Sequence, residues 1–284
     1  MDFGCFYAAN SFYDPITDTQ IVHGWVTEED LPLNLTDKQK WSGFLSLPRI
    51  LQMKCIKGVV SCSQSDLKSL DWINCSASSE GTYTVTTLSS SPDPRLSILR
   101  RNAKSLPGLP VLLESGSENR NSIPLPHLLH FDNKSLEIQA SFSVPKDVEQ
   151  IGVELYLSAA AVIFEPSEER VVIGRHNVYT GDSGVHMDIN DDPEVAPHTL
   201  FSMRNPSSQA IEQETLDIRL FFDTSVLEVF INERVAITTR VYPESGKCFG
   251  VRPFVKYGDE VTEIDRARVM ELVGWEIQPS VNWT

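Results

Sequence analysis

The chain has 284 residues, 41% of them hydrophobic and 22% charged, which is the composition of a globular protein with enough residues for one large or two ordinary domains. Its formal net charge of −15 argues against nucleic acid and anionic membranes as partners, because both require a basic face. No stretch approaches the roughly 18 apolar residues of a membrane span, and residues 1–20 lack the basic n-region of a signal peptide.

The five cysteines are odd in number and scattered, without metal-ligand spacing. They predict neither a disulfide framework nor a metal site, and we expect buried or incidental thiols. Four tripeptides fit the N-glycosylation acceptor pattern and begin at Asn34, Asn74, Asn133 and Asn282. Because such tripeptides also arise by chance, the compartment stays open, with a secreted parent protein as one alternative.

The first sixty residues follow the period of two that is typical of short antiparallel strands. The predicted strands span 5–12, 20–26, 44–47 and 54–60. A turn at Tyr13-Asp14-Pro15 separates the first pair, since proline blocks continuation of the strand and aspartate bonds to its own backbone. Four such strands are the size of one propeller blade. Because the pattern begins at residue 2, we expect the chain to start inside a domain.

Residues 61–129 read as a connecting segment. A short helix is predicted over 63–73 and a strand over 83–88. Residues 89–126 are rich in Ser, Pro, Asn and Gly, which favours a long surface connection.

Residues 130–284 contain many short strands separated by turn signals, which indicates a β-sandwich. The predicted strands span 135–144, 152–161, 170–177, 185–189, 198–203, 215–222, 226–232, 234–241, 247–255 and 268–277. The strands at 226–232 and 234–241 form a hairpin around Asn232-Glu233. Glu228 and Phe230 share one face of it, which we expect to pack within the sandwich or against the blade.

Several strings resemble glycoside hydrolase family 32, the invertases, inulinases and related β-fructosidases, and look most like its filamentous fungal members. The first region carries D-F-G-C-F-Y-A-A (2–9), H-G-W-V-T-E-E-D (23–30) and W-S-G-F-L-S-L-P-R (41–49). The second carries I-R-L-F-F-D-T-S-V-L-E-V-F-I-N (218–232), which is similar to the D-x-S-x-x-E-x-F hairpin of the family's sandwich. The resemblance implies an all-β chain, with about one blade of a five-bladed β-propeller over 1–60, a connecting segment over 61–129 and a C-terminal β-sandwich over 130–284.

Members of this family hydrolyse β-fructofuranosidic bonds of sucrose or fructans with retention, and they need no metal or cofactor. Their nucleophile, acid/base and sugar-gripping aspartate stand in N-D-P-N-G-type, E-C-P-type and R-D-P-type motifs upstream of D-F-G. This sequence contains none of the three. Its Asp-Pro strings are Tyr13-Asp14-Pro15, Pro92-Asp93-Pro94 and Asp191-Asp192-Pro193. We interpret all three as turn residues. No catalytic residue is therefore assigned, and we expect a truncated form that is inactive by itself.

Asp2 and Trp25 are the candidates for substrate binding that the resemblance implies. The aspartate of this D-x-G would face the pocket and accept hydrogen bonds from sugar hydroxyls, although the second residue of a chain is expected to fray. Trp25 would offer an aromatic wall or, alternatively, pack between blades. Some relatives have a pocket lysine where this chain has Cys5, and a cysteine cannot make that contact. The acidic run 28–30 would rim the pocket or form a solvated loop.

Gly181-Asp182-Ser183-Gly184 matches part of the nucleophile string of trypsin-like proteases, but Val185 follows where that family has glycine. No histidine stands in a matching context, so a Gly-rich turn explains the string. Three interpretations of the chain stay open: the C-terminal part of a β-fructosidase, a non-catalytic carbohydrate-binding or structural sandwich module, and a stretch without an independent role. Exposed aromatic residues grouped on one sandwich face would favour the second interpretation.

Overall fold

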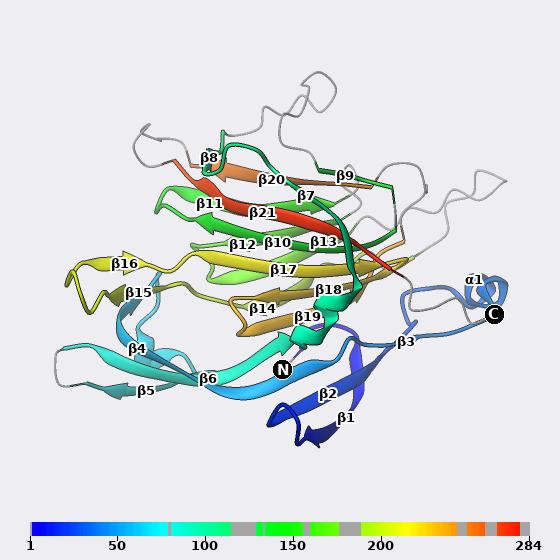
Figure 1. Cartoon of the computed structure of the whole chain (residues 1–284), viewed down its shortest axis with the longest axis horizontal. Coiled ribbons are helices and arrows are strands. Elements are labelled where there is room, and N and C mark those ends of the chain that lie inside the picture. The colour runs from blue at the N-terminus through cyan, green and yellow to red at the C-terminus, as the bar shows by residue number, and fades with distance from the viewer. Residues whose placement is uncertain are drawn as a thin grey trace.

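The computed structural model describes residues 2–78, 81–114, 129–132, 134–155, 160–175, 189–242, 249–258 and 266–278. Nearly all of its regular structure is antiparallel strand, arranged in three sheets (Figure 1), so the all-β prediction is confirmed. Two sheets stack as a sandwich, and the third lies beneath them in the figure.

The sandwich packs a seven-stranded sheet against a six-stranded one around a single large apolar core. The strands of the first sheet, in order, are β19 (Val235–Arg240), β18 (Val226–Ile231), β17 (Leu216–Asp223), β10 (Ser135–Ser143), β21 (Arg268–Ile277) and β7 (Arg100–Ser105), with β8 (Val111–Leu112) beside β21. Those of the second are β14 (Glu194–Pro197), β13 (Arg170–Arg175), β12 (Ala160–Glu165), β11 (Val148–Leu155), β20 (Phe249–Tyr257) and β9 (Leu129–Phe131).

The third sheet, called here the blade sheet, contains the predicted blade. Its main path is β1 (Phe6–Asp14), β2 (Thr19–Val26), β4 (Arg49–Cys62), β15 (Phe201–Arg204) and β16 (Ile211–Gln213). Beside this path lie β3 (Phe44–Leu45), which pairs with β2, and β6 (Tyr83–Pro92) and β5 (Asn74–Ala77), which continue from β4. The β15–β16 pair comes from the sequence of the predicted sandwich, so the two parts of the chain share one sheet.

Local sequence explains why β1 and β2 form a hairpin. The side chain of Asp14 accepts a hydrogen bond from the backbone N–H of Ile16 at 2.9 Å, and Asp18 adopts a positive φ of 52°. Aspartate tolerates this left-handed backbone better than most residues. The turn predicted at Tyr13-Asp14-Pro15 therefore occurs slightly later, over residues 15–18, because β1 continues through Asp14.

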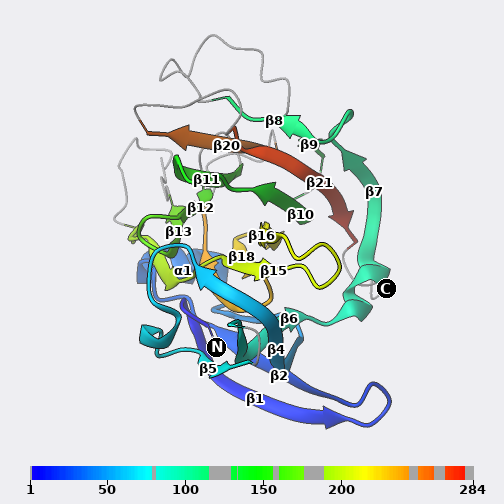
Figure 2. The ribbon, with the colours of Figure 1, turned by 90° about the vertical axis from the view of Figure 1, so that its left-hand side faces the viewer.

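Residues 61–129 hold more structure than a loose connection. The strands β5 and β6 extend the blade sheet, whereas β7 and β8 pair with β21 of the sandwich. Figure 2 shows β7 running along the side of the sandwich, above the 3-10 helix at Pro94–Leu99. The division of the chain at residues 60 and 130 stays a prediction, but strand pairing crosses both positions.

Other expected elements differ in detail. The helix predicted over 63–73 is only a 3-10 turn at Leu67–Ser69, and the helix α1 (Leu33–Gln39) was not predicted. The strand predicted over 152–161 is two strands, β11 and β12. The Gly181–Gly184 string and most of the strand predicted over 185–189 lie outside the described residues. Among the helices that the structure describes, none is long and apolar enough to cross a membrane.

Candidate functional site

Asp2 lies in a buried polar cluster between the blade sheet and the sandwich. Its side chain is 2% exposed and is bound to Arg49, whose Nη1 lies 2.5 Å from Asp2 Oδ2. The hydroxyl of Thr238 donates to the same oxygen at 2.8 Å. The backbone N–H groups of Gly4 and Thr238 donate to Oδ1 at 2.9 and 3.1 Å. Asp2 is therefore anchored, contrary to the fraying expected of a second residue.

Arg49 connects Asp2 to the hairpin of the sandwich. Its Nη2 donates to Glu228 Oε2 at 2.6 Å and also contacts Thr238 Oγ1, and its guanidinium lies 4.3 Å from the ring centre of Phe6. Burial tends to lower the pKa of Arg49, but the carboxylates of Glu228 and Asp2 outweigh burial and raise that pKa. Arg49 therefore stays charged at the centre of the cluster. Burial raises the pKa of Glu228, and Arg49 opposes that shift.

A second buried ion pair lies farther along the same interface. Arg240 Nη1 of β19 is 2.7 Å from Glu28 Oε2, and both side chains are at most 1% exposed. Tyr242 also donates to Glu28 through its hydroxyl. Asp30 pairs with Arg175 of β13 at 2.6 Å. The acidic run 28–30, expected as a pocket rim or solvated loop, instead supplies two carboxylates that bind the blade to the sandwich.

Trp25 lies on the opposite face of the blade sheet from the Asp2 cluster. Its neighbour Val26 is fully buried and pairs with Phe6, which contacts Arg49, so alternation directs Trp25 outward. Trp25 is 44% exposed and pairs with Tyr7 on one side and Leu45 on the other. The structure therefore does not bring the two predicted site residues into one pocket.

Cys5, where some relatives have a pocket lysine, is half-buried near the interface. Burial, together with the nearby carboxylates of Glu194 and Asp30, raises the pKa of its thiol to about 12. The thiol is therefore neutral near pH 7 and offers no charge to a ligand.

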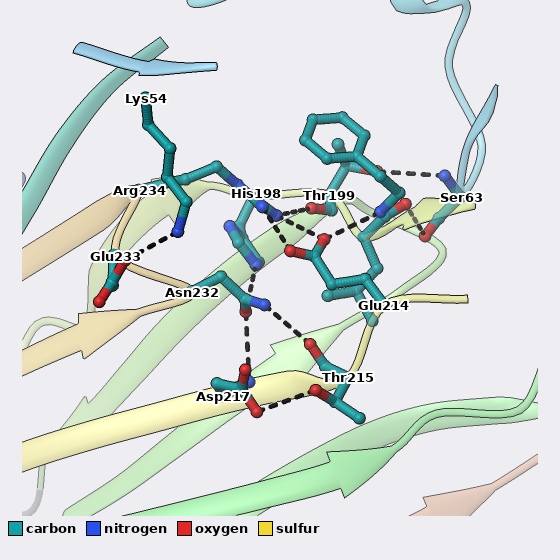
Figure 3. A network of polar contacts seen from close by, with 12 residues as sticks. Lys54, Ser63, His198, Thr199, Glu214, Thr215, Asp217, Asn232, Glu233 and Arg234 are labelled. Atoms are coloured by element: carbon teal, nitrogen blue, oxygen red, sulfur yellow. Dashed lines mark hydrogen bonds and ion pairs between the residues drawn. The ribbon is translucent and has the colours of Figure 1, made fainter. Parts of the chain in front are cut away.

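A further polar network fixes the β18–β19 hairpin and was not predicted from the sequence (Figure 3). Arg234 binds both oxygens of Glu214, at 2.5 and 2.9 Å, and donates to the carbonyl of Thr199 at 2.8 Å. Asn232 accepts from the fully buried ring of His198 at 3.2 Å. These partners are 20 to 35 residues apart, so no local pattern could have joined them. No group of three His, Cys, Asp or Glu side chains within the described part of the chain is placed to hold a metal ion.

Solved structures share this fold over 97–98% of the chain. The β-fructofuranosidase of Aspergillus kawachii superposes with a TM-score of 0.73 at 23% identity, over 97% of this chain and 47% of its own. The fructosyltransferase of A. japonicus gives a TM-score of 0.73 at 18% identity, over 97% of this chain and 44% of its own. The fructan 1-exohydrolase IIa of Cichorium intybus, solved with 1-kestose, gives a TM-score of 0.59 at 19% identity, over 98% of this chain and 49% of its own. The prediction of a partial propeller followed by a β-sandwich is confirmed, and the sheets formed by the described residues do not close.

Sequence comparisons agree with the fold. An insoluble β-fructofuranosidase, isoenzyme 3 of Oryza sativa subsp. indica, is 39% identical over 71 residues, which are 24% of this chain and 12% of that protein. The chain spans about half the length of the solved relatives. A family model described as the N-terminal domain of glycosyl hydrolases family 32 matches residues 1–63. The model for the C-terminal part of the same family matches residues 100–271, and the chain therefore belongs to glycosyl hydrolase family 32.

Proposed function

We propose that this chain supplies the last propeller blade and the C-terminal sandwich of an enzyme that hydrolyses O-glycosyl bonds of β-fructofuranosides in sucrose or fructans. The observation that carries the proposal is the buried Asp2–Arg49–Glu228 cluster. It joins the D-F-G string of the blade to the D-x-S-x-x-E-x-F hairpin of the sandwich, so the two strings that resemble the family form one physical unit.

The chain by itself would not catalyse this reaction. A retaining glycosidase needs a nucleophilic carboxylate and an acid/base carboxyl group about 5–5.5 Å apart on either side of the scissile bond. The motifs that carry these groups in the family are absent from the sequence. In this proposal the chain contacts the substrate and supports the fold of the enzyme, and the other blades supply the reacting carboxylates.

The two candidate residues would contribute differently to sugar binding. A carboxylate has about four lone-pair positions, and Asp2 accepts hydrogen bonds from Gly4, Thr238 and Arg49 at both of its oxygens. It would reach a sugar hydroxyl only by exchanging one of these donors. Trp25 offers a half-exposed ring without the loss of a hydrogen bond, so we assign the aromatic contact to Trp25.

A chimera tests the proposal. The upstream blades of the Aspergillus kawachii β-fructofuranosidase would be fused to this chain in place of the matching region, and release of fructose from sucrose and inulin would be measured. We expect turnover by the chimera and none by the chain alone. Turnover by the chain alone would contradict the claim that the reacting carboxylates lie on other blades. A folded but inactive chimera would contradict the claim that this chain completes a β-fructosidase.

A further inference from the structure

The short strand β5 carries an acceptor tripeptide for N-glycosylation, Asn74-Cys75-Ser76. β5 pairs with β6, and its other edge has no partner strand among the described residues. Figure 1 shows β5 at the bottom of the view, with the sandwich above it. A free strand edge is a template for pairing with another chain, and proteins usually blunt it with a charge, a proline or a cover. β5 contains neither a charged residue nor a proline.

Asn74 presents its amide to solvent. The residue is exposed, and its side chain has no hydrogen-bond partner within the described part of the chain. Ser76, whose hydroxyl completes the acceptor pattern, is also exposed and donates to the carbonyl of Thr84 at 3.3 Å. Because side chains at i and i+2 of a strand share one face, the Asn74 amide and the Ser76 hydroxyl are presented on the same side of β5.

A second acceptor tripeptide among the described residues, Asn34-Leu35-Thr36, has a different geometry. It lies within the helix α1, where side chains at i and i+2 diverge by roughly 200°. Thr36 is half-buried, and its hydroxyl donates to the carbonyl of Pro32 at 3.4 Å. Asn34 and Thr36 therefore do not share a face, and Asn74 is the stronger candidate for modification.

Asn74 also borders exposed apolar surface. It pairs with Thr86 of β6, which pairs with Cys55 of β4 on its other side. Two positions along the same ladder, Leu88 pairs with Met53, so both side chains lie on the face that carries Asn74. Met53 is 65% exposed and Leu88 is 40% exposed. By strand spacing they lie roughly 8–12 Å from Asn74, within reach of the first sugars of an attached glycan.

We propose that Asn74 is an N-glycosylation site whose glycan covers the free edge of β5 and the exposed Met53–Leu88 pair. An oligosaccharyltransferase joins the amide nitrogen of Asn74 to the anomeric carbon of a sugar carried on a lipid pyrophosphate. The bond from that carbon to the pyrophosphate oxygen breaks, the lipid pyrophosphate leaves with the bonding electrons, and the amide gives up one proton. The bulky, polar glycan then keeps a second chain from pairing with β5. This modification does not depend on the fructosidase role proposed above.

The test is expression of the full chain in a yeast host behind a cleavable signal sequence, followed by peptide mass spectrometry. Peptides are compared before and after peptide N-glycosidase F, which releases a glycan and leaves aspartate in place of asparagine. Material from the cells and from the medium is pooled, so retention inside the cell does not hide the result. We expect the Asn74 peptide to carry a glycan, Ser76→Ala to abolish it and Ser76→Thr to retain it. An unmodified Asn74 in the wild-type chain overturns the site.

The variant Asn74→Gln separates modification from a structural role. Because the amide has no partner in the described part of the chain, this variant of the unglycosylated protein should melt within about 2 °C of the wild type. A larger fall in melting temperature would show that Asn74 serves the fold and would overturn its assignment as a modification site.

The covering of the apolar pair is tested by oxidation with hydrogen peroxide, before and after removal of the glycan. We expect the glycan to slow sulfoxide formation at Met53 about two- to fivefold, because it shields an exposed thioether. Met270 of β21 in the sandwich is 44% exposed and serves as the internal control, with the same rate expected in both samples. Equal rates at Met53 in the two samples would overturn the covering role.

Discussion

Arg49 of β4 and Glu228 of β18 are 179 residues apart in sequence, yet their Nη2 and Oε2 atoms lie 2.6 Å apart, with side chains 1% and 4% exposed. Breaking a buried pair by removing one partner leaves a buried charge without compensation. The contact therefore makes the attachment of the blade to the sandwich depend on both residues.

The first prediction concerns this pair. Glu228→Ala should lower the free energy of unfolding by about 3–5 kcal/mol, measured by urea denaturation. The control is Glu233→Ala, which breaks the exposed pair with Lys54. It should lower the free energy of unfolding by no more than about 1 kcal/mol. Similar losses in the two variants would contradict the burial argument.

The second prediction concerns the close contact between Gly4 and β19. An ideal Cβ on Gly4 would lie 1.9 Å from the carbonyl oxygen of Thr238, which accepts from the N–H of Cys5. Gly4→Ala should therefore destabilise the chain by about 1–3 kcal/mol in thermal unfolding. Gly174→Ala is the control, because its Cβ would meet only Ile163 at 3.9 Å. A neutral Gly4→Ala would show that this backbone contact is dispensable.

The third prediction concerns pH. Burial and then the positive charge of Arg234 lower the pKa of His198 well below 6.5, while its hydrogen bond to Asn232 opposes the shift. The folded state therefore keeps His198 neutral, and the unfolded chain binds the proton. The stability from this group is complete above about pH 6.5 and is lost as the pH falls, by about 1.4 kcal/mol per pH unit.

Urea unfolding of the wild type and of His198→Gln at about pH 7.5 and pH 5.5 checks this slope. Carboxylates titrate in both proteins, so their contribution cancels in the comparison. We expect the variant to lose less stability over this interval than the wild type. Equal losses would mean that His198 is protonated in the folded state.

The fourth prediction concerns the exposed apolar row on the outer face of the blade sheet. Tyr7, Trp25 and Leu45 pair across three strands and are 64%, 44% and 74% exposed. Because such a patch promotes association, the double variant Tyr7→Lys/Leu45→Lys should reduce self-association in sedimentation velocity. Its unfolding free energy should change by less than about 0.5 kcal/mol per substitution. Ile16→Lys, at a 90% exposed position in the turn, should have no comparable effect.

The fifth prediction concerns thiol reactivity. The pKa of Cys5 is raised to about 12, first by burial, so its thiolate is scarce at neutral pH. Iodoacetamide should therefore modify the exposed Cys55 well before Cys5 in the folded chain, as followed by peptide mass spectrometry. Faster modification of Cys5 would contradict its burial at the interface.

Much of the strand content could be read from the sequence. The alternation at residues 226–241 predicted the hairpin of β18 and β19 to within about one residue at each end, because a period of two is a local property of the chain. The expected turn at Asn232-Glu233 has the positive φ values, 48° and 57°, that a tight hairpin requires. The D-F-G and D-x-S-x-x-E-x-F strings identified the family for the same reason, since each is a continuous run of residues.

The candidate site could not be read in the same way. The sequence singled out Asp2 and Trp25 and placed Glu228 at an interface, but no spacing indicated that Arg49 would join Asp2 to Glu228. It also gave no sign that Trp25 would face away from Asp2. Which residues meet across 145 to 236 positions depends on how the blade sheet lies against the sandwich.

The sequence by itself therefore determined the all-β class, the family and most of the strands, because these follow from local alternation and contiguous motifs. The tertiary structure alone decided that Asp2 is a saturated interface carboxylate, that β15 joins the blade sheet, and that Arg234 pairs with Glu214. The physical reason is that hydrogen bonds and ion pairs between distant strands form only when the sheets pack. A buried charge is then stabilised by the oppositely charged or hydrogen-bonding group that packing places beside it.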